Sequence, residues 1–177
     1  YLVISSKNID GVFRDIEFLG KVTGVEGRAG KIIQDMKKDL SCLASRVRDV
    51  AKVRVFCVID ATDLNNPWTA GPGSVVDSLI TTAGGENIAA KLSAPCVQFG
   101  IEEVVNSDPD VIIIDTSMGS TMVVIEEIGE HPIWRQMTAV KQNRVYPIDG
   151  NLVNRPGARI VQGLEEITKI IHPDLFK

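Results

Sequence analysis

Acidic side chains follow two of the apolar runs that this sequence offers as strands. Asp60 and Asp63 come after the apolar run 53–59, and Asp115 follows the run 111–114. Carboxylates at strand ends could ligate a hard cation through oxygen, or act as a pair in acid–base chemistry. The same residue types also cap turns, and we favour that plainer role for all three.

The segment 70–74 reads Ala-Gly-Pro-Gly-Ser and predicts a tight turn from a strand into a helix, with Ser74 as the helix cap. Such a turn can hold a phosphate on the N–H groups of the first helical residues. However, no Lys-Ser/Thr pair follows it as in a P-loop, and the Gly-x-Gly-x-x-Gly pattern is absent. An α/β enzyme that binds a phosphate-bearing ligand at Gly71–Ser74 is therefore the alternative function, and not the first one.

Trp68 and Arg155 are the side chains best suited to contact a bulky ligand. An aromatic side chain in a loop suits a flat or large ligand. The guanidinium of Arg155 can bind anionic groups through two hydrogen bonds or, equally well, pair with the acidic surface of the protein. Arg159, one helical turn further, is more simply explained as a helix-surface residue. His131 and His172 both precede proline, and no Ser/His/Asp or Cys/His arrangement is present. We therefore predict a binding protein without catalytic residues.

From residue 53 onward, apolar strand runs alternate with amphipathic helical patterns. Such alternation predicts the α/β class, with a Rossmann-like parallel sheet that helices cover on both faces. Ligands of these sheets bind beyond the carboxyl ends of the strands. In this sequence that rim consists of residues 60–71, 115–120 and 149–157.

The first part of the chain has a different pattern. Residues 1–4 predict a short strand, and residues 9–22 predict a helix that ends at Gly24. Residues 25–51 carry apolar side chains at steps of three and four, which predicts one helix of about 40 Å. We expect this long helix to lie across a larger body, or to pair with a second copy.

Composition narrows the function classes. The chain has 177 residues, of which 44% are hydrophobic and 24% are charged, as in ordinary globular proteins. No apolar run approaches the roughly 20 residues of a membrane-spanning helix. The net charge is −4, divided into +4 for residues 1–54 and −8 for residues 55–177. This balance argues against a nucleic-acid partner and allows a basic partner for the second part.

The supply of metal-ligating side chains is small. Cys42, Cys57 and Cys96 form no Cys-x-x-Cys pair, and the chain has only two histidines. We therefore predict no resident metal and no cofactor, and we expect the three cysteines to be buried as small apolar side chains. Because the chain begins with Tyr1 and not with Met, we expect it to have been processed or cut.

Several segments, in this order, resemble one group of known proteins. They are residues 70–74, 77–80, 83–87, 102–113, 137–146 and 155–159. Together they resemble the carboxyl-terminal half of the ABC-importer binding proteins that capture metal chelates. The resemblance implies two α/β lobes joined by a long rigid helix, with the ligand between the lobes. Residues 1–24 then correspond to the end of the first lobe, 25–52 to the interlobe helix and 53–177 to the second lobe, so most of the first lobe is absent.

The resemblance also implies a function. The chain would belong to a protein that captures an iron–siderophore, or alternatively haem or cobalamin, and delivers it to a membrane permease outside the cytoplasm, with a lipid anchor in the full-length protein. Cys96 stands near the position of a ligand-facing Trp in one cobalamin-binding relative, which weakens the cobalamin alternative. Glu102 matches the glutamate that docks onto a permease arginine. The ligand-facing residues implied are Trp68, Thr116, Ser117, Met118, Asn151, Asn154 and Arg155.

Overall fold

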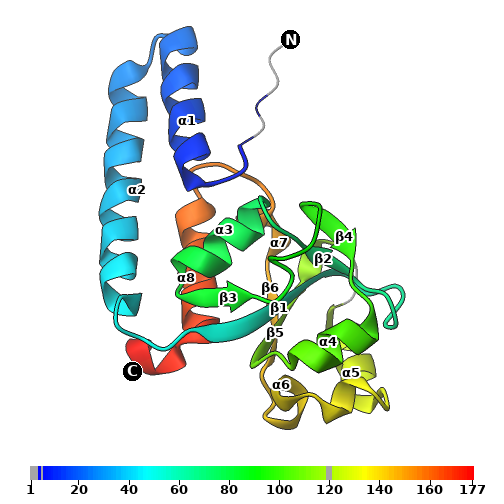
Figure 1. Ribbon diagram of the computed structural model, residues 1–177. Helices are drawn as coiled ribbons and strands as arrows, with labels where there is room; N and C mark the ends of the chain where they lie inside the picture. Colours follow the sequence, from blue (N-terminus) through cyan, green and yellow to red (C-terminus); the bar gives the residue numbers. More distant parts are fainter. Residues whose placement is uncertain (1–3, 5, 119–120) are drawn as a thin grey trace.

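The computed structural model describes residue 4, residues 6–118 and residues 121–177. Its centre is a six-stranded sheet in the order β4–β2–β1–β5–β6, with β3 paired to the first half of β1 (Figure 1). The strands are β1 (Val53–Asp60), β2 (Trp68–Ala70), β3 (Gly85–Asn87), β4 (Cys96–Gln98), β5 (Val111–Asp115) and β6 (Val145–Ile148).

The centre of the sheet is parallel, as the alternation of strands and helices predicts. Strand β1 pairs in parallel with β5 and β3, and β5 pairs in parallel with β6. The sheet as a whole is mixed, because β2 runs antiparallel to β1 and β4 runs antiparallel to β2. The sequence did not predict these two strands, since three residues are too few to give a periodic signal.

The central strands are buried on both faces. Successive side chains of a strand point to opposite faces, so β1 places Val55 and Cys57 in one core and Phe56 and Val58 in the other. All four side chains are almost completely buried. The continuous apolar runs in the sequence are thus the expected pattern for a sheet covered on both sides.

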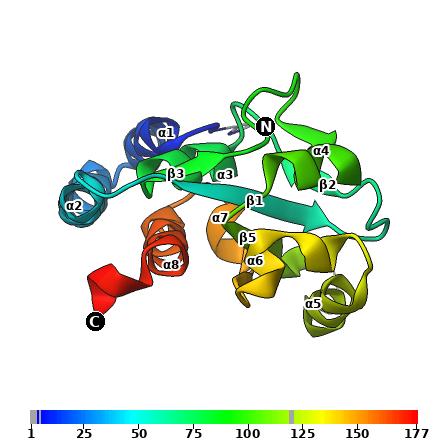
Figure 2. The same ribbon diagram turned by 60° about the horizontal axis from the view of Figure 1, so that its bottom comes forward.

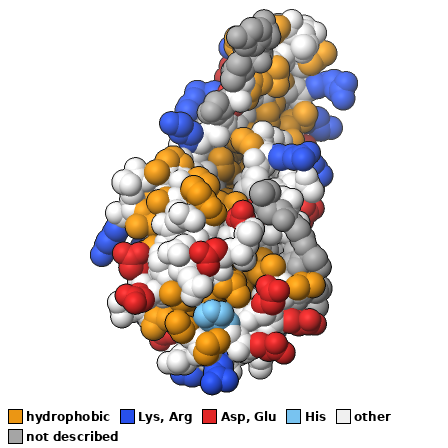
Figure 3. Space-filling view, turned by 90° about the vertical axis from the view of Figure 1, so that its right-hand side faces the viewer, with side chains coloured by type: hydrophobic (Ala, Val, Ile, Leu, Met, Phe, Trp, Pro, Cys, Tyr) orange, Lys and Arg blue, Asp and Glu red, His pale blue; other side chains and the backbone are white. Residues whose placement is uncertain are grey.

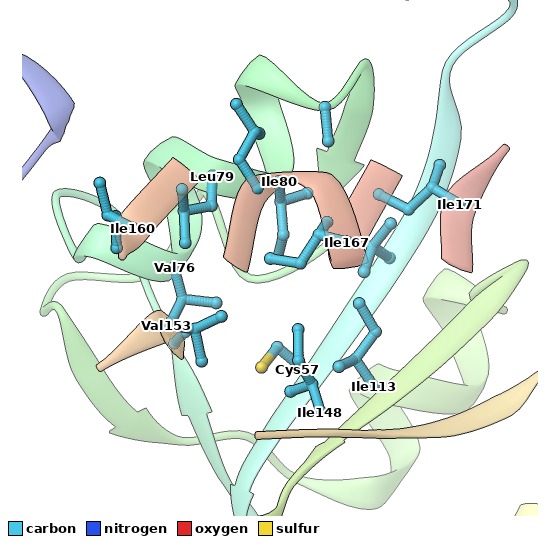
Figure 4. Close-up of a cluster of buried hydrophobic side chains, with 14 of the residues drawn as sticks. Cys57, Val76, Leu79, Ile80, Ile113, Ile148, Val153, Ile160, Ile167 and Ile171 are labelled. Carbon is cyan, nitrogen blue, oxygen red and sulfur yellow. The ribbon is translucent and has the colours of Figure 1, made fainter. Parts of the chain in front are cut away.

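The face of the sheet that carries Val55 and Cys57 is covered by α3 and by helices from both ends of the chain. Figure 4 shows Leu79 and Ile80 of α3 and Ile167 and Ile171 of α8 gathered around this core, with Cys57 of the sheet below them. These helices are α1 (Ile9–Thr23), α2 (Glu26–Val47), α3 (Val75–Thr82), α7 (Gly150–Val153) and α8 (Ile160–Ile171), followed by the 3-10 turn η3 (Pro173–Phe176).

The second face is covered by the helices of the middle of the chain. Trp134 is completely buried there, its ring centroid lies 6.0 Å from that of Phe56, and its Nε1 donates to the carbonyl oxygen of Leu64 at 2.8 Å. The elements on this side are α4 (Ile101–Ser107), α5 (Thr121–Glu130), η2 (Trp134–Gln136) and α6 (Thr138–Lys141).

Helices α1 and α2 form an antiparallel pair that extends beyond the α/β body (Figures 1 and 2). Gly24 ends α1 in the left-handed conformation at φ 70°, and Asn8 caps its start by accepting from the N–H of Gly11. The two helices approach closely, because a Cβ on Gly20 would lie 2.5 Å from that of Ala29. Helix α2 is shorter than the predicted 25–51, and it continues without a break through the half-buried Leu40.

The outer part of this pair exposes apolar side chains. Helix α2 buries only Ala29, Met36 and Leu43, which lie seven residues apart on one stripe. Nearer the tip of the pair, the exposed fraction is 46% for Phe18 and 64% for Val22. Residues that have helical spacing in the sequence, and would suit a core, therefore face solvent in this chain.

Two aspartates hold the turn before β5. Asp110 binds Arg54 through Nε and a second guanidinium nitrogen, at 3.1 and 2.8 Å, and the pKa of this carboxyl is lowered chiefly by that hydrogen-bonded guanidinium. Asp108 accepts from the N–H and hydroxyl of Thr138 at the start of α6, and these hydrogen bonds lower its pKa. The acidic turn is thus structural.

Some sequence predictions fall outside the described residues or are wrong. The strand predicted for residues 1–4 involves residues 1–3, which the structure does not describe. Cys57 is buried as expected, and burial raises the pKa of its thiol to about 12. Cys42 and Cys96 are exposed, so the prediction for them is wrong. Cys42 lines an open groove between α2 and α8, and Cys96 lies on the edge strand β4. Within the described residues, no helix combines the length and apolarity needed to cross a bilayer.

His172 is a buried titratable group that follows the end of α8. Its side chain is 6% exposed, and its Nε2 has no hydrogen-bond partner among the described residues. The pKa of His172 is lowered, mainly by burial and also by the charge of Arg144, while backbone groups of Gly84 and Ala83 oppose the shift. The folded state therefore resists protonation of this imidazole, and the unfolded chain does not.

We expect the free energy of unfolding to fall as the pH drops below about 6.5, because the unfolded chain then binds the proton that folded His172 resists. His172→Gln should flatten the stability curve between pH 5 and 7, measured by urea unfolding. His131→Gln, which leaves His172 in place, should retain this contribution. An unchanged pH slope in His172→Gln would contradict the assignment.

Candidate functional site

The carboxyl ends of β1, β5 and β6 meet along one edge of the sheet, as the rim prediction requires. Parallel pairing aligns Val58 of β1 with Ile114 of β5, and Asp115 with Ile148 of β6. Trp68 joins the same edge by another route, because the antiparallel strand β2 places it opposite Asp60. The three rim segments are therefore neighbours in space.

A hydrogen-bonded network connects two of these segments. The backbone N–H of Ser117, in the 3-10 turn η1 (Thr116–Met118), donates to Oδ1 of Asp115 at 2.8 Å. The side-chain amide of Asn154, after α7, donates to Oδ2 of the same carboxylate. Asp115 itself is 5% exposed, so its charge lies below the surface that Ser117 and Asn154 present.

Gly150 allows this network to close. A Cβ at this position would overlap Oδ1 of Asp115 and would lie 2.7 Å from the Cβ of Ser117. The first residue of α7 therefore packs directly on the carboxylate. Asp149 caps the same short helix by accepting from the N–H and side-chain amide of Asn151, both at 2.9 Å.

The ligand-facing residues implied by the resemblance are largely exposed at this rim. Trp68 is 41% exposed, Thr116 is half-buried, and Ser117 and Asn154 are exposed. Asn151 and Arg155 are exposed too, and among the described residues Arg155 forms no ion pair. The backbone of Met118 belongs to η1, while its side chain and the rim residues 119–120 lie outside the description.

The glycine-rich turn has a carboxylate of its own at the start of α3. Ser74 caps the helix by accepting from the N–H of Asp77 at 3.1 Å, and Asp77 accepts from the N–H of Gly73 at 3.3 Å. The buried Asn87 donates to Asp77 at 2.8 Å and to the carbonyl oxygen of Ala70 at 2.8 Å. A phosphate here would meet the negative charge of Asp77, so the geometry favours the tight helix start.

The acidic residues after β1 act as caps. Asp60 accepts from the N–H and hydroxyl of Thr62, and Asp63 accepts from the N–H of Asn65 and the amide of Asn66. These hydrogen bonds lower the pKa of both carboxyls. No group of three His, Cys, Asp or Glu side chains in the described part of the chain could hold a metal ion.

The described part of the molecule also has grooves away from the rim. One of about 400 Å³ runs between α2 and α8 and includes Asp35, Asp39 and Phe176 in its lining. Another of about 450 Å³ lies where the start of α1 meets α2 and α3. Neither lining includes a rim residue, so both grooves are separate from the rim.

Glu102 lies in the first turn of α4, on the part of the molecule far from α2 (Figures 1 and 2). Both Glu102 and Glu103 are exposed, and Gly100 precedes the helix as its cap residue. In Figure 3, acidic side chains gather on the α/β body, whereas Lys and Arg gather mainly on the helical pair and at the lower margin. The exposed acidic residues of α4, α5 and the loop after β1 are Asp63, Glu102, Glu103, Glu126, Glu127 and Glu130.

The sequence did not predict the hydrogen bonds by which Asp115 and Asn87 connect distant segments. For Asp115, the signal is an acidic residue at the very end of an apolar strand, followed by a short polar turn. For Asn87, the signal is weaker, since its partners Ala70 and Asp77 lie 17 and 10 residues away along the chain. Neither set of contacts can be read from spacing alone.

Comparison with known proteins gives one consistent result. A sequence model of the periplasmic binding protein family matches residues 2–152. The uncharacterized ABC transporter substrate-binding lipoprotein YvrC of Bacillus subtilis is 29% identical over 176 residues, which cover 99% of this chain and 54% of the relative. A cobalamin-binding protein of Halobacterium salinarum is 27% identical over 175 residues, covering 95% of this chain and 46% of the relative.

Solved structures agree with the sequence comparison. The crystal structure of a periplasmic binding protein from Veillonella parvula matches with a TM-score of 0.85 at 25% identity, and the match covers 94% of this chain and 57% of that one. This chain therefore spans about half the length of the relatives that it matches.

We expect Asn87→Ala to lower the free energy of unfolding by about 1–3 kcal/mol, because it removes the amide that donates to the carbonyl oxygen of Ala70 and to Oδ1 of Asp77. The exposed Asn66→Ala is the matched control and should change stability by less than about 0.5 kcal/mol. Urea unfolding of both variants measures the difference. Equal, small effects would show that the Asn87 network does not stabilise the turn.

Proposed function

Because the chain belongs to the periplasmic binding protein family, we propose that it is part of an ABC-importer substrate-binding protein that captures a metal chelate. The observation that carries this proposal is the polar and aromatic rim at the carboxyl ends of the parallel strands. That edge is where α/β sheets bind ligands. The rim presents hydrogen-bonding groups and an exposed indole, and its described residues include no nucleophile–base pair.

The proposed protein has two lobes, of which this chain supplies one. We assign residues 1–24 to the end of the first lobe, 25–52 to the interlobe helix and 53–177 to the second lobe. Support comes from the helical pair that extends beyond the body and from relatives about twice as long. A first lobe packed on this pair would cover exposed side chains such as Phe18 and Val22.

A homodimer is the second way to cover these helices. Self-association of the isolated chain through the exposed apolar residues would remove the same surface from water. We propose it only for the chain by itself. In the longer protein the first lobe would occupy this surface and leave a monomer.

The ligand class follows from the rim and from the relatives. An iron–siderophore, a haem or a cobalamin is large enough to contact Trp68, Thr116, Ser117, Met118, Asn151, Asn154 and Arg155 together. The cobalamin-binding relative supports a corrinoid. Arg155, which has no ion-pair partner among the described residues, would suit the anionic groups of an iron–siderophore or haem. We retain the iron–siderophore as the first candidate, and the metal enters as part of the ligand.

The geometry of the glycine-rich turn argues against the alternative function, an enzyme that binds a phosphate-bearing ligand. A phosphate-bearing ligand at Gly71–Ser74 would have to displace the hydrogen bond between Gly73 and Asp77, and to bind beside a carboxylate. The relatives described above are named for binding or transport. We therefore propose a non-catalytic protein without a cofactor of its own.

The proposed partner is the membrane permease of the importer. The acid-rich surface of the α/β body suits a basic partner, and the exposed Glu102 is our candidate for the docking contact. Such a protein works outside the cytoplasm. The lipoprotein relative supports a lipid anchor in the longer protein.

We expect a bound chelate to quench the fluorescence of Trp68, which is exposed at the rim, more than that of the buried Trp134. The probes are ferrichrome, haemin and aquocobalamin, each titrated into this chain. One of them should bind saturably, and Trp68→Phe should remove most of the quenching and weaken binding by roughly three- to tenfold. Absence of saturable binding for all three probes, also in a two-lobed parent protein, would contradict the chelate proposal.

We expect Glu102→Ala to reduce permease binding of the two-lobed protein while folding and ligand affinity stay nearly unchanged. Loss of one partner of a desolvated charge pair costs about 2–5 kcal/mol of association energy, whereas an exposed glutamate adds little to stability. Glu103→Ala is the matched control, because the adjacent helical residue points about 100° away. A pull-down with the permease separates the outcomes, and a loss in Glu103→Ala alone would place the docking residue one position further.

A further inference from the structure

We propose that Asp115 is a positioning residue, which holds Ser117 and Asn154 in the orientation that a ligand at the rim would meet. This inference rests on the proposed function, because it explains how the binding surface is kept in shape. Asp115 does not itself belong to that surface, since its side chain is 95% buried. It lies at the last position of β5, where the rigid sheet ends and the rim begins.

Both carboxylate oxygens of Asp115 are engaged within the chain. Oδ1 accepts from the backbone N–H of Ser117, two residues later, and Oδ2 accepts from the side-chain amide of Asn154, 39 residues later. One buried group therefore ties the η1 turn to the segment after α7. The exposed side-chain amide of Asn154 uses one N–H to bind Asp115. The oxygen and the second N–H of this amide can therefore bind a ligand.

Gly150 packs closely against one side of the carboxylate. A side chain on Gly150 would collide with Oδ1 of Asp115 and with the side chain of Ser117. The start of α7 thus closes over the carboxylate from one side. The charge of Asp115 also contributes to the raised pKa of Cys57, which places that charge near the buried core of the sheet.

This geometry distinguishes a positioning role from direct ligand contact. An asparagine at position 115 could still accept from the N–H of Ser117, and its amide could donate to a flipped Asn154, so the network would survive without the charge. An alanine would remove both hydrogen bonds. A carboxylate that binds the ligand directly would instead be sensitive to the loss of charge itself.

The test compares Asp115→Ala and Asp115→Asn with Asp149→Asn, an exposed carboxylate in the same segment. Backbone amide exchange is measured first, by NMR and without ligand. We expect Asp115→Ala to speed exchange at least about tenfold in residues 116–118 and 150–155 but not in β1. Asp115→Asn should remain within about threefold of the unsubstituted chain in both segments, and Asp149→Asn should leave residues 116–118 unchanged.

Ligand binding is measured next, with ferrichrome, haemin and aquocobalamin as probes. Asp115→Ala should weaken binding of the captured probe at least about tenfold, and Asp115→Asn should restore it to within about threefold. Equal losses in both variants would overturn the proposal in favour of direct charge contact. Unchanged binding in Asp115→Ala would show that the network orients nothing the ligand uses.

Two further outcomes separate this inference from the proposed function. If the unsubstituted chain and its two-lobed parent bind no probe, the chelate proposal fails, whereas the exchange data still decide whether Asp115 positions the two segments. If Asp115→Ala does not fold, Gly150→Ala replaces it, because this variant keeps Asp115, Ser117 and Asn154 but forces them apart. Unchanged exchange in residues 116–118 and 150–155 of Gly150→Ala would then overturn the inference.

Discussion

Parallel pairing of β1, β5 and β6, with both faces of these strands buried, is the constraint on which the rest of this structure depends. Because Val55 and Cys57 point to one core and Phe56 and Val58 to the other, two separate sets of helices must cover the sheet. Parallel pairing also brings the carboxyl ends of the strands to one edge. The position of the rim is therefore a consequence of how the core is built.

At that edge, buried polar groups arrange the exposed ones. Asp115 ties η1 to the segment after α7, and Asn87 ties the glycine-rich turn to α3. A buried polar group is costly unless its hydrogen bonds are made, so each of these side chains favours one arrangement of its loop. The proposed binding surface thus has hydrogen-bonded polar groups beneath it.

The helical pair has the opposite character. Helix α2 is anchored to the body through Met36 and Leu43, while the tip around Phe18 and Val22 remains in solvent. Apolar side chains on an otherwise well-formed helix indicate a surface that another body covers. Under the proposed function, a first lobe would cover this surface in a longer protein, since the relatives are about twice as long as this chain.

The sequence by itself determined the elements whose signals are local. Gly24 ends α1, Ser74 caps α3, and the apolar run 111–114 forms a strand buried on both faces, because each depends on residues a few positions apart. The ordered motifs also indicated the family. The predicted α2 continued to residue 51, whereas the helix ends at Val47. The short strands β2, β3 and β4 were not predicted, since a three-residue strand has no period to detect.

Only the tertiary structure decided which side chains work together. Asp115 meets Asn154 across 39 residues, and Trp68 reaches the rim because β2 turns back against β1. The exposure of Cys42 and Cys96 likewise depends on which side of a helix or sheet faces solvent. Such contacts arise from packing between distant segments, and the spacing of residues along the chain carries no direct record of them.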